Sequence, residues 1–159
     1  MLIRMTKKSD GRHRLTVVRD DGTVSQGKMI PGFGADAIPH DLLHAVVEKN
    51  LGFKRGVYGL VNTGLDIADL LAPERKATLK AEAELMLSEL ITGVLQAEAA
   101  YEGFDPEQLR DELARRCEEH RLDVPVLSET DLSGLRRLRD EHRERWAALR
   151  VGDTMEIEL

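Results

Sequence analysis

IPHDLLHAVVEKNL, residues 38–51, is the segment around which the rest of the chain is organised. Its apolar residues recur at three- and four-residue spacings, which predicts an amphipathic helix that begins near Pro39 and is closed by Gly52. On this helix His40 and His44 are four residues apart. Four residues advance a helix by about 6 Å and return to nearly the same face, so the two imidazoles can hold one metal ion or one polar ligand.

Strand-like segments lie at both ends of the chain. Three of them precede the helix, at residues 2–5, 13–19 and 23–30. The turn sequences SDG (9–11) and DDG (20–22) separate these three, which predicts an antiparallel β-meander over residues 1–30. Residues 154–159 alternate apolar and polar side chains, so we expect them to add a fourth strand.

Residues 74–150 are predicted to be helical. An apolar stripe indicates one long helix from residue 74 to about residue 101. Asp105 and Ser128 each stand three residues before a side chain that can complete a capping box, which predicts two more helices after them.

The glycine-rich connection at residues 52–73 is longer than a simple link between helices requires, so we expect a packed loop or a short helix over the site. The whole pattern predicts an α+β fold in one domain, residues 1–159. In this fold a small antiparallel meander, with three N-terminal strands and a C-terminal fourth, packs against about four α-helices.

Composition excludes several classes of function. Charged residues make up 33% of the chain, the net charge is −6, and both signs are interleaved, which is typical of a solvated surface and disfavours nucleic-acid binding. No apolar run approaches the length of a membrane span, and the N-terminus lacks the apolar core of a signal peptide, so we expect a cytoplasmic protein without membrane contact. A single cysteine, Cys117, rules out an internal disulfide and a thiolate zinc cage.

The histidine pair needs a third ligand from another part of the chain. Glu48 lies about 12 Å along the helix axis from His40, too far for both to hold one ion. Asp66, after the glycine-rich stretch, is the leading candidate, and with His40 and His44 it gives a metal set for a zinc-like divalent transition metal. The other candidate pocket residues are Asp41, Glu48, Asp69 and His142.

Known catalytic motifs fit this segment poorly. A zinc protease of the H-E-x-x-H type needs a long carboxylate as general base, and Asp41 is one methylene shorter than the glutamate of that motif. An HD-type phosphohydrolase needs a further upstream histidine on a helix, whereas His13 falls on a predicted strand. Phosphate-binding glycine spacings are absent. The catalytic residues and the small-molecule ligand are therefore left unassigned, and whether the protein is an enzyme is left open.

The segment PHDLLHAVVEKNLGFKRGVYGLVNTGLDI resembles a motif of an uncharacterised family of small bacterial proteins. That motif, H-D-L-x-H-x-x-V-E followed by G-L-V and D-I, covers about a fifth of the chain. Its positions are occupied here by His40, Asp41, His44, Glu48, Gly59 and Asp66. The resemblance implies that the site lies in this segment and implies no particular activity.

Two hypotheses about function follow. The first is a soluble protein with a polar or metal-binding pocket around HDLLH that supports hydrolytic chemistry, in which replacement of a partly exposed His44 by alanine costs about 1 kcal/mol or less of stability. The second is a non-catalytic oligomerisation or protein-interaction module in which the histidines are structural. Under it, a helix of about 28 residues spans roughly 40 Å and pairs with a second copy in a homodimer.

Overall fold

The computed structural model describes residues 1–9, 12–28, 38–70, 72–100 and 105–159. Its sheet has four antiparallel strands in the order β3-β2-β1-β4. They are β1 (Leu2–Lys7), β2 (His13–Val18), β3 (Val24–Lys28) and β4 (Thr154–Glu158). The predicted α+β class and the C-terminal fourth strand are confirmed. Residues 29–30 of the predicted third strand lie outside the described residues.

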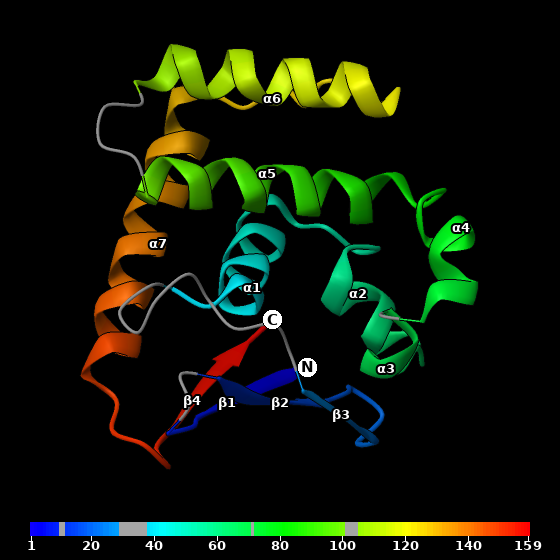
Figure 1. Cartoon of the computed structure of the whole chain (residues 1–159), viewed down its shortest axis with the longest axis vertical. Coiled ribbons are helices and arrows are strands. Elements are labelled where there is room, and N and C mark those ends of the chain that lie inside the picture. Colours follow the sequence, from blue (N-terminus) through cyan, green and yellow to red (C-terminus); the bar gives the residue numbers. More distant parts are fainter. Residues whose placement is uncertain (10–11, 29–37, 71, 101–104) are drawn as a thin grey trace.

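Strand alternation gives the sheet one apolar face. Ile3 is paired with Val17 on one side and with Ile157 on the other, and all three side chains are buried. The next buried row consists of Met5, Leu15 and Met155. Because side chains on a strand alternate between faces, these rows point to the same side of the sheet, where the helices cover them (Figure 1).

Four longer helices cover that face in layers. They are α1 (His40–Leu51), α5 (Ala83–Ala100), α6 (Pro106–His120) and α7 (Glu129–Ala148). In Figure 1, α1 lies between the sheet and α5, and α6 lies on the far side of α5. The expected caps are present: Asp105 and Ser128 form capping boxes, and Gly52 ends α1 in the left-handed conformation with φ 69°. The helix that carries the histidines is therefore the most enclosed in the fold.

The predicted helix over residues 74–101 is wrong in one respect. The chain instead forms a 3₁₀ turn η1 (Pro73–Arg75), a short helix α4 (Lys76–Leu79) and then α5, with turns over residues 80–82. Leu79 packs there in a small second core, while Glu82 pairs with Arg55. No glycine or proline marks this break, because tertiary contacts rather than local sequence produce it. The dimer argument from a 28-residue helix loses its premise, and the homodimer stays a prediction.

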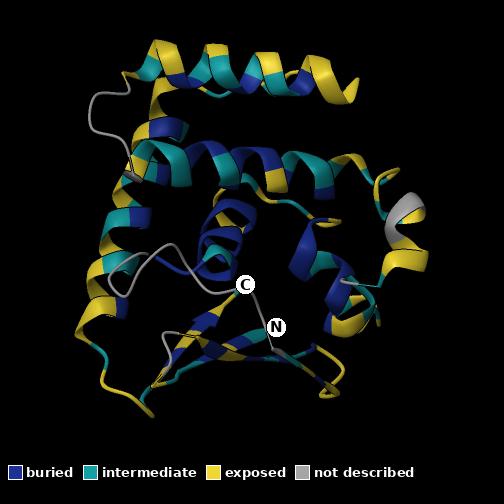
Figure 2. Cartoon of the chain, in the orientation of Figure 1, coloured by how far each residue is buried: buried dark blue, intermediate teal, exposed yellow. Residues whose placement is uncertain are grey.

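The glycine-rich connection contains two short helices, α2 (Val57–Asn62) and α3 (Ile67–Leu70). Figure 2 shows that α1 is buried almost throughout, whereas α6 and α7 keep exposed outer faces. Burial on α1 extends to three polar side chains, Asp41, His44 and Glu48. Cys117 is likewise buried, without a disulfide partner. Among the described residues, no helix combines the length and apolar character that crossing a membrane requires.

Candidate metal centre

Three side chains from α1 and α5 converge on one point. The Nε2 atoms of His40 and His44 are 3.0 Å apart, and Oε2 of Glu89 lies 3.3 Å from the first and 3.4 Å from the second. Zinc bonds of about 2.0–2.1 Å at tetrahedral angles place neighbouring ligand atoms about 3.3 Å apart. The three atoms therefore form a near-regular triangle with the dimensions of one face of a zinc coordination tetrahedron.

Helix geometry explains this convergence. The two imidazoles are one helical turn apart on α1, with ring centroids 4.6 Å apart and ring planes at 83°. α5 packs across this face of α1 and brings the carboxylate of Glu89 to the two rings. The third side chain, Glu89, comes from a helix that is distant in sequence and is fixed in space by core packing.

The Nδ1 atom of each imidazole, which faces away from the other ring, is hydrogen-bonded to a side chain of α5. Nδ1 of His40 lies 2.9 Å from Oε1 of Gln96, an atom that can only accept a hydrogen bond. Nδ1 of His44 lies 2.8 Å from Oγ of Ser88, whose single proton is donated to Glu48. Both Nδ1 atoms must therefore carry the hydrogen, which leaves a lone pair on each Nε2 when the rings are neutral. Two nitrogen lone pairs and a carboxylate oxygen then face one point, which favours a cation there.

The pKa shifts agree with this reading. Burial lowers the pKa of His40, but hydrogen bonds with Glu89 and Gln96 and the negative charge of Glu89 outweigh it, so the pKa is raised above 6.5. Burial raises the pKa of Glu89, but hydrogen bonds donated by the imidazoles of His40 and His44 in their protonated form, together with their positive charge, outweigh that effect and hold the pKa well below its usual range. In the metal-free protein, His40 therefore keeps its proton to a higher pH than a free imidazole does.

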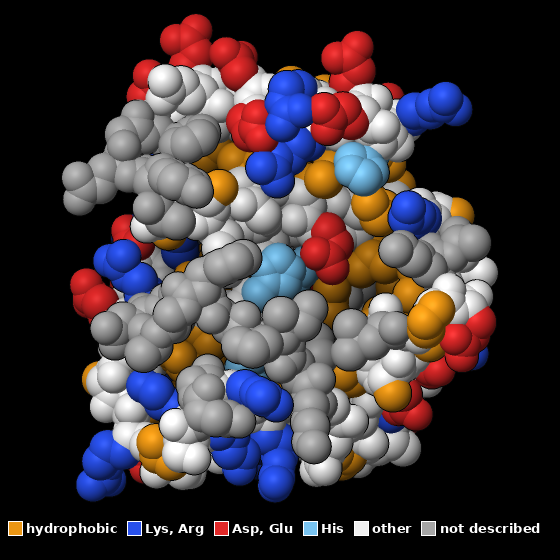
Figure 3. Space-filling model, viewed as in Figure 1, with side chains coloured by type: hydrophobic (Ala, Val, Ile, Leu, Met, Phe, Trp, Pro, Cys, Tyr) orange, Lys and Arg blue, Asp and Glu red, His pale blue; other side chains and the backbone are white. Residues whose placement is uncertain are grey.

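One side of the centre is open to solvent. The side chain of His44 is 2% exposed, whereas those of His40 and Glu89 are 25% and 45% exposed. Figure 3 shows pale blue histidine atoms beside a red acidic side chain near the middle of the face viewed. A cation held by these three ligands would keep at least one coordination position directed toward the exposed side.

Two of the expected pocket residues on α1 point elsewhere. The carboxylate of Asp41 is buried and lies 2.7 Å from Nε2 of His13 on β2. Asp41 is therefore not placed as a general base beside His40, unlike the glutamate of the H-E-x-x-H motif. Glu48 is also buried, and its carboxylate accepts hydrogen bonds from the backbone N–H groups of Val57 and Tyr58 at the start of α2.

The other expected residues also lie outside the group of His40, His44 and Glu89, which we call the triad. Asp66, expected as the third ligand, is mostly exposed and accepts a hydrogen bond of 2.7 Å from Arg19. Asp69 accepts a hydrogen bond from the backbone N–H of Asp66, and Nδ1–H of His142 on α7 donates to the carbonyl oxygen of Leu138. Among the described residues, the group with ligand atoms within 4.8 Å of one another is His40, His44 and Glu89. The structure therefore brings Glu89, and not Asp66, next to the two imidazoles.

Sequence reasoning missed Glu89, Ser88 and Gln96. One signal was available: Ser88 and Thr92 are four residues apart on the apolar stripe of α5, and both are fully buried. Polar side chains on a buried helix face need partners, and here both approach Nδ1 of His44. Such a pair marks the helix that faces the histidines, and Glu89 is next to it.

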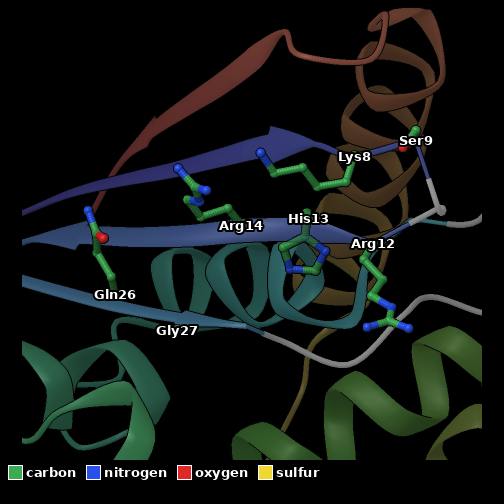
Figure 4. Close-up of a pocket in the computed structure, with 7 residues that line it drawn as sticks. All are labelled: Lys8, Ser9, Arg12, His13, Arg14, Gln26 and Gly27. Carbon is green, nitrogen blue, oxygen red and sulfur yellow. The ribbon is translucent and has the colours of Figure 1, made fainter.

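A separate pocket of about 660 Å³ lies at one end of the sheet. Its described lining has basic and polar side chains and no acidic ones: Lys8, Ser9, Arg12, His13, Arg14, Gln26 and Gly27. Figure 4 shows Arg12 and His13 on the side of the sheet facing the helices, whereas Arg14 and Gln26 point away from them. The basic side chains therefore do not converge on one ligand position, and none of the triad residues lines this pocket.

Comparisons with known proteins add no family. No family model, no curated protein and no solved structure matches the chain. The resemblance to a family of small bacterial proteins stays a prediction, so the function has to be argued from the side chains themselves.

Proposed function

We propose that this protein binds one zinc-like divalent transition metal ion through Nε2 of His40, Nε2 of His44 and a carboxylate oxygen of Glu89. The observation that carries the proposal is the triangle of 3.0, 3.3 and 3.4 Å between three atoms that all offer lone pairs. Two histidines and a glutamate are one of the ligand sets that catalytic zinc sites use, with water in the fourth position.

An open site of this kind supports hydrolytic chemistry. A metal ion polarises a bound carbonyl or phosphoryl oxygen and makes a bound water acidic enough to attack near neutral pH. The exposed edges of His40 and Glu89 leave this side of the centre accessible to solvent. The interaction-module alternative gains nothing from α5, because the exposed large apolar side chains among the described residues are Val24, Val124, Val126 and Val151, and none of them is on that helix.

The test is elemental analysis of protein purified without chelators, followed by titration with zinc. The wild-type chain should retain or take up one equivalent of metal, and a His40→Ala/His44→Ala double variant should take up none. His142→Ala removes a histidine from α7, outside the triad, and should bind metal like the wild type. Equal and negligible metal in the wild type and the double variant would contradict the proposal.

A further inference from the structure

A buried chain of hydrogen bonds continues from the centre into the core. Nδ1 of His44 is 2.8 Å from Oγ of Ser88, and Ser88 donates to Oε1 of Glu48 at 2.9 Å. All three residues are almost completely buried, at 1%, 0% and 3% exposure. We infer that Ser88 and Glu48 are positioning residues that fix the tautomer of His44 and keep its Nε2 lone pair directed at the metal. This inference rests on the proposed metal site.

The direction of the chain follows from what each group can donate. The carboxylate of Glu48 accepts from the backbone N–H of Val57 at 2.7 Å, from that of Tyr58 at 2.9 Å and from Ser88. A group with three donors around it acts as an acceptor, so the serine proton points to Glu48. Oγ of Ser88 can then only accept from His44, which puts the ring hydrogen on Nδ1. The opposite tautomer would place a hydrogen on Nε2, where the metal has to bind.

Packing around Glu48 limits its freedom to move. A Cβ atom at Gly56 would lie 2.4 Å from Cδ of Glu48 and 2.7 Å from each carboxylate oxygen. The backbone at the start of α2 thus closes directly over the carboxylate, and only glycine permits this approach. Glu48 is held by α2 on one side and holds Ser88 on the other. The orientation of His44 is therefore set by groups that never touch the metal.

Hydrogen-bond partners of a metal-ligating histidine affect the affinity of the site for the metal. A histidine ligand whose second nitrogen loses its hydrogen-bond partner typically binds metal 10- to 100-fold more weakly. Ser88→Ala removes the partner of His44 and one of the three donors to Glu48, while alanine fits the space and favours a helix. Thr92→Val is the matched control: Oγ1 of Thr92 is 3.5 Å from the same Nδ1 atom and outside the chain to Glu48.

Two measurements on the full chain test the inference. Nitrogen-15 NMR of the metal-free protein above neutral pH should show His44 as the Nδ1–H tautomer in the wild type and in Thr92→Val, and a mixture of tautomers in Ser88→Ala. Competition titration with zinc should give an affinity about 10- to 100-fold lower for Ser88→Ala and unchanged for Thr92→Val. Ser88→Thr keeps a hydroxyl group at this position and should keep the Nδ1–H tautomer of His44.

The outcomes separate this inference from the proposed function. Ser88→Ala that keeps the Nδ1–H tautomer, or binds zinc as tightly as the wild type, would overturn the positioning role. Thr92→Val with the same loss would overturn it too, since the effect would then be one of packing. A wild-type chain that binds no zinc but shows the predicted tautomer change in Ser88→Ala contradicts the metal site and supports the control of His44 by Ser88.

Discussion

Nε2 of His40 lies 3.0 Å from Nε2 of His44, while the Nδ1 atom of each ring is hydrogen-bonded to another side chain. With both rings neutral, two lone pairs would face each other at this distance beside the carboxylate of Glu89, an arrangement that only a cation stabilises. In the absence of metal, a proton on His40 supplies that cation at pH values below the raised pKa of this ring. Metal and proton therefore compete for the same position.

Glu89 should be essential for metal binding, whereas Asp66 should not. Glu89→Ala removes one of three ligands and the only negative charge among them, so zinc affinity should fall about 100-fold or more, beyond the 10- to 100-fold typical of an outer partner. Asp66→Ala removes a carboxylate bound to Arg19 instead. Competition titration compares the two variants with the wild type. Equal losses in both variants would contradict the assignment of the third ligand.

Zinc affinity should depend on pH through His40. Its pKa is raised above 6.5, so a proton blocks Nε2 below that raised value, and affinity should increase as the pH rises through it. Glu89→Gln removes the charge that raises this pKa, so the weaker binding of that variant should reach its plateau at a lower pH. Affinity measured by competition across the neutral range tests this, and an affinity independent of pH would contradict the account.

The metal-free protein should show the opposite trend in stability. The folded pKa of His40 is raised, so its contribution to the free energy of unfolding is complete below the ordinary histidine pKa and is lost as the pH rises through the raised value. The folded pKa of Glu89 is depressed, so its contribution is lost as the pH falls below 4.5 toward the depressed value. Denaturant midpoints measured in chelator should therefore decline as the pH rises above the raised pKa of His40 and as it falls below 4.5. Both declines should be less steep in Glu89→Gln.

His44→Ala should destabilise the fold more than His40→Ala does. The expectation that His44 is partly exposed is wrong, because its side chain is 2% exposed and hydrogen-bonded to Ser88. Its removal leaves a cavity and takes away the donor to the buried Ser88 oxygen, at a cost of about 2 kcal/mol or more. His40 is 25% exposed, and its loss should cost about 1 kcal/mol. Denaturant unfolding in chelator measures both, and equal midpoints would contradict this difference in burial.

Gly56→Ala should unfold the region around Glu48. The new Cβ would lie 2.4 Å from Cδ of that residue, so the carboxylate or α2 must move. The free energy of unfolding should fall by about 2 kcal/mol or more. Gly134→Ala is the matched control on α7: its nearest contact would be Asn50 at 3.7 Å, so the better helix propensity of alanine should make it neutral or stabilising by up to about 1 kcal/mol. Thermal unfolding of both variants checks this, and a stable Gly56→Ala would show that α2 adjusts freely.

Local sequence was sufficient to predict the parts of the fold that local chemistry determines. The capping boxes at Asp105 and Ser128 place the starts of α6 and α7, and the left-handed Gly52 ends α1 where expected. The alternation in residues 154–159 identified β4 because one sheet face is buried. The end of the helix before α5 was missed, since the turn there depends on contacts of Leu79 and Glu82 with the segment around α2.

The candidate site was half predictable for a similar reason. The spacing of His40 and His44 is a local property of one helix, so the pair could be recognised. Glu89 is brought to them by the packing of α5 against α1, which no spacing along the chain records. Asp66 had the right chemistry and the right neighbourhood in sequence, but Arg19 binds its carboxylate on another part of the surface. Third ligands from a different helix require the tertiary structure.

The most direct measurement is an anomalous difference map from crystals of the full chain grown with zinc. The account predicts one peak at about 2.0–2.2 Å from Nε2 of His40, Nε2 of His44 and a carboxylate oxygen of Glu89, with solvent in the remaining position. A crystal of Glu89→Ala should lose that peak. Zinc bound at Asp66 or His142 instead, or no zinc between the two imidazoles at saturating concentration, would contradict the central claim.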